Sequence, residues 1–361
     1  MDKKKLSTEI SNKYTEEKRI IIPFIGAGIS RIVEDKNGKN ILPDWDEFNE
    51  GLLSDISEIG KYGYFKNDPQ EVAEYYIHRK TEIDKNAHQY SGSDEFLYGK
   101  SKLVEFMKKK LSVEFTNSGA NYLVNGKESE KLEIHFALKE KFEIIYTTNW
   151  DNLLEKITGY KGVHLSSQLV ISDVRKRKNV IIKFHGDINT EVHEEGNSLI
   201  CCKTDYFRRI LHENPFDLLF KNDLLHSDFL FMGYSFRDPN IFLVISEINE
   251  LVTTKDIGSK TTVYWLVTDY KDNPRLKVMS NTNIQPVLLL PEDEQEKLKQ
   301  QEKKLEKLCE DCRVDFNDIN PKEHCKKCPP RTNMENELRK KEREVGYENL
   351  KKFINGLPKL Y

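Results

Sequence analysis

Short runs of apolar residues recur along this chain and alternate with segments that have helical spacing. The runs are rich in β-branched and aromatic residues, and they begin near positions 20, 142, 179, 228, 262 and 285. Continuous apolar runs of this length are typical of strands that are buried on both faces of a sheet. Helical patterns such as "WDNLLEKI" and "DPNIFLVISEINELV" lie between the runs. The alternation predicts an α/β fold with a Rossmann-like parallel sheet.

Two segments interrupt this alternation. From about 45 to 140 the chain carries helical patterns such as "PQEVAEYYIHRK" and few strand signals, which predicts a helical insertion subdomain that caps the sheet. After Pro291 the composition shifts to charged helical sequence with few apolar positions. We therefore expect residues 1–290 to form the α/β domain and residues 291–361 to form a charged helical tail. The tail is either a separate module or an oligomerisation arm.

Charge and hydropathy exclude several classes of partner. Lys and Arg number 57 against 60 Asp and Glu, and the net charge of −3 provides no general attraction to nucleic acid or anionic lipid. The basic stretch "VRKRKN" is typical of a solvated loop. No apolar segment approaches the roughly 20 residues that span a bilayer, and the N-terminus lacks the apolar core of a signal peptide. We expect a cytoplasmic protein with no membrane contact and no direct nucleic-acid binding.

The six cysteines fall into two groups. Adjacent residues of a strand point to opposite faces, so the neighbours Cys201 and Cys202 are interpreted as packing residues. The other four form two CxxC pairs: Cys309, Cys312, Cys325 and Cys328. In a reducing compartment two such pairs can supply four thiolates to a tetrahedral structural zinc ion, and disordered free thiols are the alternative.

The first apolar run ends in the loop "FIGAGIS", which contains Gly26 and Gly28. A backbone that turns sharply after a strand can present N–H groups to a phosphate, because a Cβ at either position would hold the ligand away. Arg31 stands where the dinucleotide fingerprint requires its third glycine, so the loop alone is an incomplete match. A glycine turn without any ligand is the alternative interpretation.

Polar residues also follow the next three apolar runs. They are Thr147, Thr148, Asn149 and Asp151 after the second run, His185, Gly186 and Asp187 after the third, and Gly233, Tyr234, Ser235 and Asp238 after the fourth. Each set by itself is explained by turns and helix caps, and Asp238 in particular is a plausible cap before Pro239. Ligands of open α/β sheets bind outside the carboxyl ends of the strands. Four polar sets at one edge therefore predict a ligand site.

Together these motifs resemble the sirtuin-like family over roughly residues 20 to 290. The matching segments are Gly26-Ala27-Gly28-Ile29-Ser30 for the phosphate-binding loop, Thr148-Asn149-Trp150-Asp151 for the Thr-x-Asn-x-Asp segment, His185-Gly186 for the His-Gly pair and Gly233-Tyr234-Ser235 for the Gly-x-Ser turn. The stretch "GYSFRDPNI" is similar to the version found in bacterial sirtuin-like proteins of antiviral defence. The resemblance implies that the ligand is NAD and that the α/β domain is catalytic.

The resemblance also implies roles for individual residues. Asn149, His185 and Asp151 are the candidate catalytic residues: the amide holds ribose hydroxyls or a water molecule, the imidazole acts as general base, and the carboxylate orients this pair. The candidate dinucleotide-binding residues are Gly26, Ala27, Gly28, Ser30, Thr148, Gly233 and Ser235. Cleavage of the nicotinamide-ribose bond creates an oxocarbenium-like carbon, so the site requires positioning and electrostatic support more than a strong acid.

Three functions share these residues. The first is a NAD hydrolase that releases nicotinamide and ADP-ribose as a NAD-depleting effector of antiphage defence, controlled by a partner or by homo-oligomerisation. By resemblance, a HerA-type ring ATPase is a candidate partner. The second is a protein deacylase or ADP-ribosyltransferase, which is disfavoured because residues 187 to 235 contain only Cys201 and Cys202 and lack an internal zinc module. The third is a non-catalytic NAD-sensing scaffold, which would require neither Asn149 nor His185.

Overall fold

The computed structural model of the chain describes residues 3–17, 19–65, 68–84, 89–119, 121–164, 177–189, 199–212, 214–254, 261–268, 274–311 and 329–360. Its central sheet has seven parallel strands in the order β11-β10-β9-β1-β6-β8-β7. The strands are β1 (Ile20–Ile25), β6 (Ile144–Thr147), β7 (Lys161–Val163), β8 (Val180–Lys183), β9 (Ser227–Met232), β10 (Val263–Val267) and β11 (Ile284–Leu288). This arrangement confirms the predicted Rossmann-like α/β fold.

Six of these strands coincide with the six predicted apolar runs, because both faces of the sheet are covered. Neighbouring residues of one strand belong to different cores: Ile21 packs in one and Ile22 in the other, and Leu230 and Phe231 divide in the same way. The seventh strand, β7, has three residues with a glycine in the middle. It lies at the edge of the sheet and carries no continuous apolar run, so the sequence pattern did not predict it.

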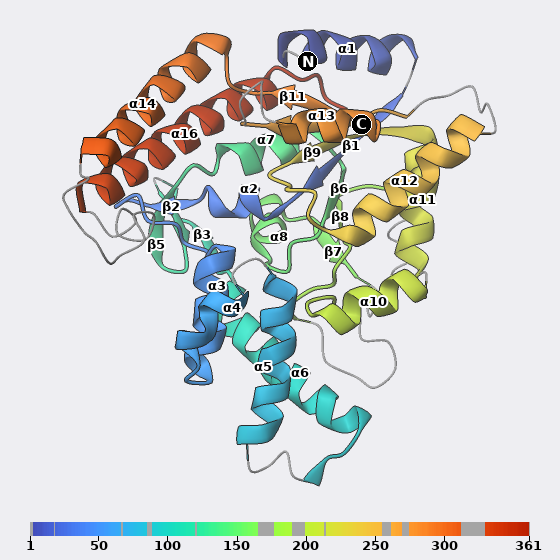
Figure 1. The fold of residues 1–361 in the computed structure, drawn as a ribbon. Coiled ribbons are helices and arrows are strands. Elements are labelled where there is room, and N and C mark those ends of the chain that lie inside the picture. The colour runs from blue at the N-terminus through green and yellow to red at the C-terminus, as the bar shows by residue number, and fades with distance from the viewer. Residues whose placement is uncertain are drawn as a thin grey trace.

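Helices form a layer on each face of the sheet (Figure 1). The first face is covered by α1 (Lys3–Glu16), α7 (Glu133–Lys141) and α16 (Pro329–Asn355). The second is covered by α11 (Pro215–His226), α12 (Pro239–Thr254) and α13 (Pro274–Asn281). Within the described ranges, no helix combines the length and the apolar character that crossing a bilayer requires.

The described residues of the insertion form four α-helices, a 3-10 turn and a small sheet. The helical elements are α3 (Trp45–Asp55), η1 (Ile59–Lys61), α4 (Tyr62–Phe65), α5 (Pro69–Ile83) and α6 (Ser93–Leu111), and they project from the sheet layer in Figure 1. The antiparallel sheet has the order β2 (Glu34–Asp35), β5 (Lys127–Glu130), β4 (Tyr122–Val124) and β3 (Phe115–Asn117). Strands of two to four residues are too short to show a periodic pattern, so the sequence indicated mainly helices here.

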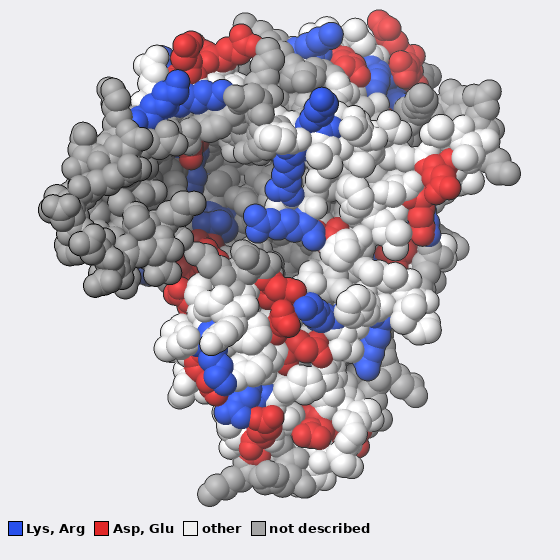
Figure 2. Space-filling model, in the orientation of Figure 1, with Lys and Arg blue, Asp and Glu red and all other residues white. Residues whose placement is uncertain are grey.

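The insertion helices pack against the end of the sheet where the predicted site lies. Their core, which includes Leu52, Tyr76 and Leu103, also contains Trp150 and Ile188 from loops that follow β6 and β8. On the outer surface of these helices, basic and acidic side chains are interspersed (Figure 2), with ion pairs such as Lys80–Asp55 at 2.7 Å. The insertion therefore forms a wall beside the carboxyl ends of the strands.

The tail differs from the expected separate module or arm. Its helix α14 (Glu292–Asp311) lies beside α16 (Figure 1), and the C-terminal part of α16 enters the main core. Leu350 and Ile354 pack in the cluster that contains Leu6 of α1, and the Leu360 N–H donates to the Lys141 carbonyl at 2.8 Å. Apolar positions at 347, 350, 353, 354 and 357 carry the helical spacing that could have predicted this. The end of the tail is part of the α/β domain.

One buried histidine makes the stability of this fold dependent on pH. The His135 side chain of α7 is fully buried, and neither ring nitrogen has a hydrogen-bond partner among the described residues. Burial disfavours the imidazolium and lowers the pKa of His135 from 6.5 to about 4. Between pH 6.5 and pH 4 the unfolded chain therefore binds a proton at His135 and the folded chain does not. The free energy of unfolding falls as the pH falls through this range.

We expect this histidine to contribute a loss of about 2 kcal/mol between pH 7 and pH 5. Denaturant unfolding of the wild type and of His135→Leu at both pH values measures this loss. Between pH 7 and pH 5 the free energy of unfolding of the variant should fall by about 2 kcal/mol less than that of the wild type. Exchange of the exposed His226 for glutamine should leave the pH dependence unchanged. Equal pH dependence in the wild type and in His135→Leu would contradict the prediction.

Candidate active site

The strand register brings the four predicted motifs to one edge of the sheet. Met232, Ile25, Thr147 and Lys183 lie in one row as the last residues of β9, β1, β6 and β8. Because the strands are parallel, the four polar sets follow directly after this row. After β1 the chain passes to β6 on one side, and after β9 it passes to β10 on the other. The crevice between β1 and β9 is therefore the topological switch point, where open α/β sheets bind ligands.

The glycines of the first loop are required by a close approach of two backbones. The Gly26 N–H donates to the Met232 carbonyl and the Gly28 N–H to the Gly233 carbonyl, both at 2.9 Å. A Cβ on Gly26 would collide with the Gly233 carbonyl oxygen, and a Cβ on Gly28 would lie 2.8 Å from the same atom. The group that a side chain would meet is thus the loop after β9, and the Gly28 amide is bonded within the chain. The sequence predicted that these glycines make room for a ligand, and the structure adds that they make room for the backbone of Gly233.

Gly26→Ala tests this close approach. The added methyl group would force the loops after β1 and β9 apart, because its obstacle is backbone and cannot rotate away. We expect a loss of about 1–3 kcal/mol in the free energy of unfolding, as for other overpacked sites. Denaturant titration measures it, with Gly60→Ala as the control, since nothing lies within 4 Å of a Cβ there. Similar unfolding midpoints for the two variants would contradict the prediction.

Three buried polar side chains form a hydrogen-bonded network beside this loop. Asn149 Nδ2 donates to Ser30 Oγ at 3.0 Å, and Ser30 Oγ donates to Asp151 Oδ1 at 3.2 Å. The Asn149 N–H also donates to Thr147 Oγ1, which fixes the start of the loop. Asn149 Oδ1 is buried and has no hydrogen-bond partner among the described residues. Ser30, predicted as a phosphate ligand, here connects two candidate catalytic residues, and the Asn149 carbonyl oxygen is the acceptor that remains.

A buried lysine that was not predicted holds the loop containing Asn149 and Asp151. Lys183, the last residue of β8, is fully buried and donates to the carbonyl of Asp151 at 2.6 Å. Its Nζ also lies 2.9 Å from Glu155 Oε1 and 2.6 Å from Asp187 Oδ2. Burial raises the pKa of the Asp151 carboxyl, and the nearby Lys183 offsets this only in part. A lone lysine inside the apolar run "NVIIKFHG" was the signal that could have revealed this role.

His185 follows β8 and faces the loop after β9. Gly186, its neighbour, has φ of +84°, a left-handed turn that a side chain would strain. His185 Nε2 lies 2.8 Å from Asp238 Oδ2, and the Tyr206 ring meets the imidazole edge-on at 5.3 Å between centroids. Burial tends to raise the pKa of the Asp238 carboxyl, but the adjacent His185 outweighs this and lowers it below its ordinary value. Asp238 is thus a site residue beyond the helix cap that the sequence indicated.

The other predicted binding residues lie on the same edge and are more open. Ala27 and Thr148 are half-buried, and Gly233 and Ser235 are exposed. The Ser235 carbonyl accepts a hydrogen bond from Arg275, which ties the loop after β9 to α13. Ala27, Gly28 and Ser30 lie in the short helix α2 (Ala27–Arg31), which follows β1, and the other predicted catalytic and dinucleotide-binding residues lie in loops at the same carboxyl edge.

The structure describes the side chains of one of the two groups of cysteines. Cys201 and Cys202 are buried, as expected of packing residues, but they precede α10 (Lys203–Leu211) rather than lie in a strand. Both thiols therefore reach the same atom, Asp205 Oδ2, at 3.5 and 3.2 Å, instead of opposite faces. The predicted zinc ligands fall outside the described side chains: Cys309, Cys312, Cys325 and Cys328. Within the part of the chain that the structure describes, no group of His, Cys, Asp and Glu is arranged to hold a metal ion.

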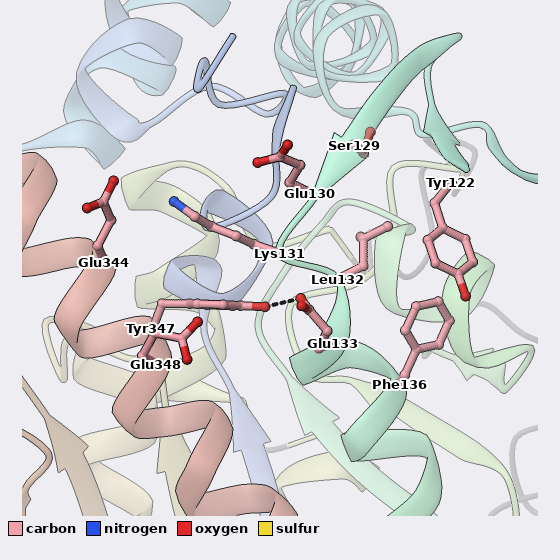
Figure 3. Close-up of a pocket in the computed structure, with 10 residues that line it drawn as sticks. All are labelled: Tyr122, Ser129, Glu130, Lys131, Leu132, Glu133, Phe136, Glu344, Tyr347 and Glu348. Atoms are coloured by element: carbon pink, nitrogen blue, oxygen red, sulfur yellow. Dashed lines mark hydrogen bonds between the residues drawn. The ribbon is translucent and has the colours of Figure 1, made fainter. Parts of the chain in front are cut away.

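A separate cleft of about 650 Å³ lies between α7, the β4–β5 hairpin and α16 (Figure 3). Tyr347 donates to Glu133 across it, and three further glutamates line it: Glu130, Glu344 and Glu348. Lys131, also in its lining, is paired with Glu34. Four carboxylates would repel a diphosphate, so this cleft does not suit a dinucleotide.

Comparison with known proteins agrees with the chemistry of the carboxyl edge. Residues 143–287 match the family model of the SIR2-like domain. This part of the chain is similar to a SIR2-like domain. This matched range begins at β6 and contains Asn149, His185 and the loop after β9, whereas the Gly26 loop lies outside it. The sheet places that segment beside the matched range, because β1 pairs with both β6 and β9.

The chain is also similar to curated proteins named NAD(+) hydrolase ThsA. The protein from Cytobacillus dafuensis is 33% identical over 132 residues, which cover 35% of this chain and 25% of that protein. The one from Acinetobacter baumannii (strain 532279) is 34% identical over 107 residues, 28% of this chain and 21% of that protein. The one from Enterococcus faecium is 31% identical over 149 residues, 37% of this chain and 29% of that protein. The chain thus spans between a fifth and a third of the length of these relatives.

Proposed function

We propose that this chain is a NAD hydrolase that cleaves the bond between nicotinamide and ribose and releases nicotinamide and ADP-ribose. The main support is that Asn149 and His185 follow neighbouring strands of the sheet and each contacts one side of the topological switch point, Asn149 through Ser30 after β1 and His185 through Asp238 after β9. The similarity to proteins named NAD(+) hydrolase points to the same reaction. The match covers only part of those relatives, so the activity of this chain is our inference from its own residues.

The described residues fit NAD as a substrate. The buried Asn149 Oδ1 lacks a partner among them and can accept a hydrogen bond from a ribose hydroxyl or from the attacking water. The amide is held by Ser30, which in turn is held by Asp151, so the acceptor is fixed before the substrate arrives. Such preorganisation lowers the cost of orienting the reacting groups. Asp151 acts here through Ser30 rather than by touching Asn149 directly.

The proposed reaction conserves atoms and charge. A water oxygen bonds to the C1′ atom of the ribose as the bond from C1′ to the pyridinium nitrogen breaks, and the electron pair of that bond neutralises the nitrogen. The water proton passes to the imidazole of His185, which acts as general base. Nicotinamide leaves as a neutral molecule, and the proton on His185 is later lost to solvent. We place the dinucleotide backbone beside Ala27 and Gly28 in the first turn of α2 and beside Thr148 and Ser235 in the loops after β6 and β9.

We further propose that this activity depletes NAD in antiphage defence and is controlled. Unregulated NAD hydrolysis would be toxic to the cell, so a partner or homo-oligomerisation must restrain it. The resemblance of "GYSFRDPNI" to defence proteins supports this role, and a HerA-type ring ATPase remains the candidate partner. The four tail cysteines remain candidate ligands of structural zinc, which metal analysis of the purified chain would test.

Two other functions use the same residues. A deacylase or ADP-ribosyltransferase must bind a polypeptide, yet residues 199–226 contribute α10, α11 and the buried cysteine pair rather than a zinc module. A sensing scaffold would bind NAD without a general base, and it would not require the contact between His185 and Asp238. Both alternatives differ from the hydrolase in their products.

Product analysis distinguishes the three functions. The purified chain, alone and with candidate partners, is incubated with NAD, and nicotinamide and ADP-ribose are quantified with and without an acetyl-lysine peptide. We expect equal amounts of both products without the peptide. Nicotinamide release that requires the peptide would indicate a deacylase. NAD binding without any nicotinamide release, by the chain or by any complex, would refute the hydrolase and favour the scaffold.

A further inference from the structure

We infer that Asp238 is a positioning residue that holds His185 as the general base of the hydrolase. This deepens the proposed function, and it rests on that function for its chemistry. Asp238 lies in the loop after β9, far from His185 in the sequence, and its Oδ2 lies 2.8 Å from His185 Nε2. Neither atom has a hydrogen bond of good geometry in the described part of the chain. Contacts of this kind often align only when the substrate binds.

The two oxygens of the Asp238 carboxylate have different partners. Oδ1 accepts a hydrogen bond from the Asn240 N–H at 2.9 Å, which caps the start of α12. This cap fixes the rotation of the carboxylate and directs Oδ2 towards the imidazole. An N-cap requires only one oxygen, and serine or asparagine would serve equally well. The second oxygen is therefore the part of Asp238 that the fold alone does not explain.

Side chains of β9 and β10 hold the loop that carries Asp238. Phe236 has φ of +50°, an uncommon conformation for a residue with a side chain, and its buried ring packs against that of Phe231, tilted by 39° with 4.6 Å between centroids. The Trp265 Nε1–H donates to the Tyr234 carbonyl at 2.8 Å. Aromatic packing from two neighbouring strands thus holds the loop in a strained form, and the strain is located next to the carboxylate.

The geometry assigns each nitrogen of His185 a task. A carboxylate beside Nε2 favours the tautomer with its proton on Nε2, so Nδ1 keeps the lone pair that accepts the water proton. The imidazolium that forms during hydrolysis is then stabilised by the negative charge of Asp238. Both side chains are nearly excluded from solvent, at 4% and 9% exposure, so water screens this interaction little. In enzymes with a Ser-His-Asp triad, replacing the aspartate by asparagine lowers kcat about 10⁴-fold through loss of the correct tautomer.

Two substitutions separate this role from helix capping. Asp238→Ser and Asp238→Asn each retain a good N-cap but remove the charge that faces His185. We expect kcat for NAD to fall about 10- to 1,000-fold, with KM within threefold of the wild-type value and a melting temperature close to wild type. Asp228→Asn is the matched control. That carboxylate is fully buried at the opposite end of β9 and pairs with Lys13 and Arg19, so its loss should lower the melting temperature and leave kcat near the wild-type value.

A second measurement requires no turnover. In protein labelled with ¹⁵N-histidine, the ring nitrogens of His185, identified by their loss in His185→Gln, should report the tautomer protonated on Nε2. Both Asp238 variants should shift this signal towards a mixture of tautomers. An unchanged spectrum, or kcat of Asp238→Ser within twofold of wild type, would overturn the inference. If the spectrum shifts as expected but the wild type and its complexes never cleave NAD, the proposed hydrolase function fails instead.

Discussion

Replacing His185 by alanine is expected to lower the rate of NAD hydrolysis by about 100- to 10,000-fold, because the attacking water loses its general base. Replacing Asn149 by alanine should cost about 100- to 1,000-fold, the range for a preorganised polar group at a reacting centre. The Asn149 amide is held by Ser30 and the His185 imidazole faces Asp238, so the two groups reach the substrate from different loops. Nicotinamide release at saturating NAD measures both effects.

The control for these variants is a histidine outside the candidate site. His226 is exposed at the end of α11, directly before the amino end of β9, on the edge of the sheet opposite to His185. His226→Ala should retain the wild-type rate. His226→Ala should keep the wild-type melting temperature, whereas Asn149→Ala and His185→Ala truncate buried side chains and should melt cooperatively at a somewhat lower temperature. Full turnover in either Asn149→Ala or His185→Ala would refute the assigned site.

Lys183→Met should strongly destabilise the fold, with an expected loss of about 3–5 kcal/mol in the free energy of unfolding. The wild-type ammonium is fully buried and neutralises Glu155 and Asp187, while it also donates to the Asp151 carbonyl. Burial alone lowers the pKa of a lysine, but these carboxylates reverse the shift and raise the pKa of Lys183. Methionine preserves the volume and leaves two carboxylates without a cation.

Denaturant unfolding of Lys183→Met is compared with that of Lys351→Met. Lys351 also pairs with a carboxylate, Glu133 at 3.1 Å, but this pair is at the surface and should contribute less than about 1 kcal/mol. Adding Glu155→Gln and Asp187→Asn to Lys183→Met should restore part of the lost stability, because neutral amides do not require the missing charge. Losses of similar size for Lys183→Met and Lys351→Met would show that the buried cluster does not hold the loop.

Local patterns predicted the sheet and the edge that carries the site. A strand buried on both faces must be continuously apolar, which is why β1, β6, β8, β9, β10 and β11 were recognisable. Parallel strands place their carboxyl ends together, so the polar sets after four of them could be assigned to one edge without knowing any contact. The strands β2, β3, β4 and β5 escaped prediction because each has only two to four residues, too few to show a periodic pattern.

The tail and the cysteine pair show where local patterns were insufficient. In α16 five apolar positions with helical spacing lie among many charged residues. They are buried because α1 and α7 leave part of one sheet face uncovered, and α16 packs there. Adjacent cysteines would diverge in a strand, but at the start of α10 both thiols turn towards Asp205. For the tail the deciding partner comes from another part of the chain, and for the cysteines it is the helix that begins at the next residue.

The order of residue types along the chain, by itself, determined that an amide, an imidazole and two glycine turns meet at the carboxyl edge of a parallel sheet. Tertiary structure alone decided which atoms pair there: Ser30 with Asn149 and Asp151, Lys183 with the carbonyls of the same loop, and Asp238 with His185. Periodicity reports whether a residue faces a core, because burial acts on each position separately. A hydrogen bond between distant loops depends on strand register and aromatic packing, which involve the whole domain at once.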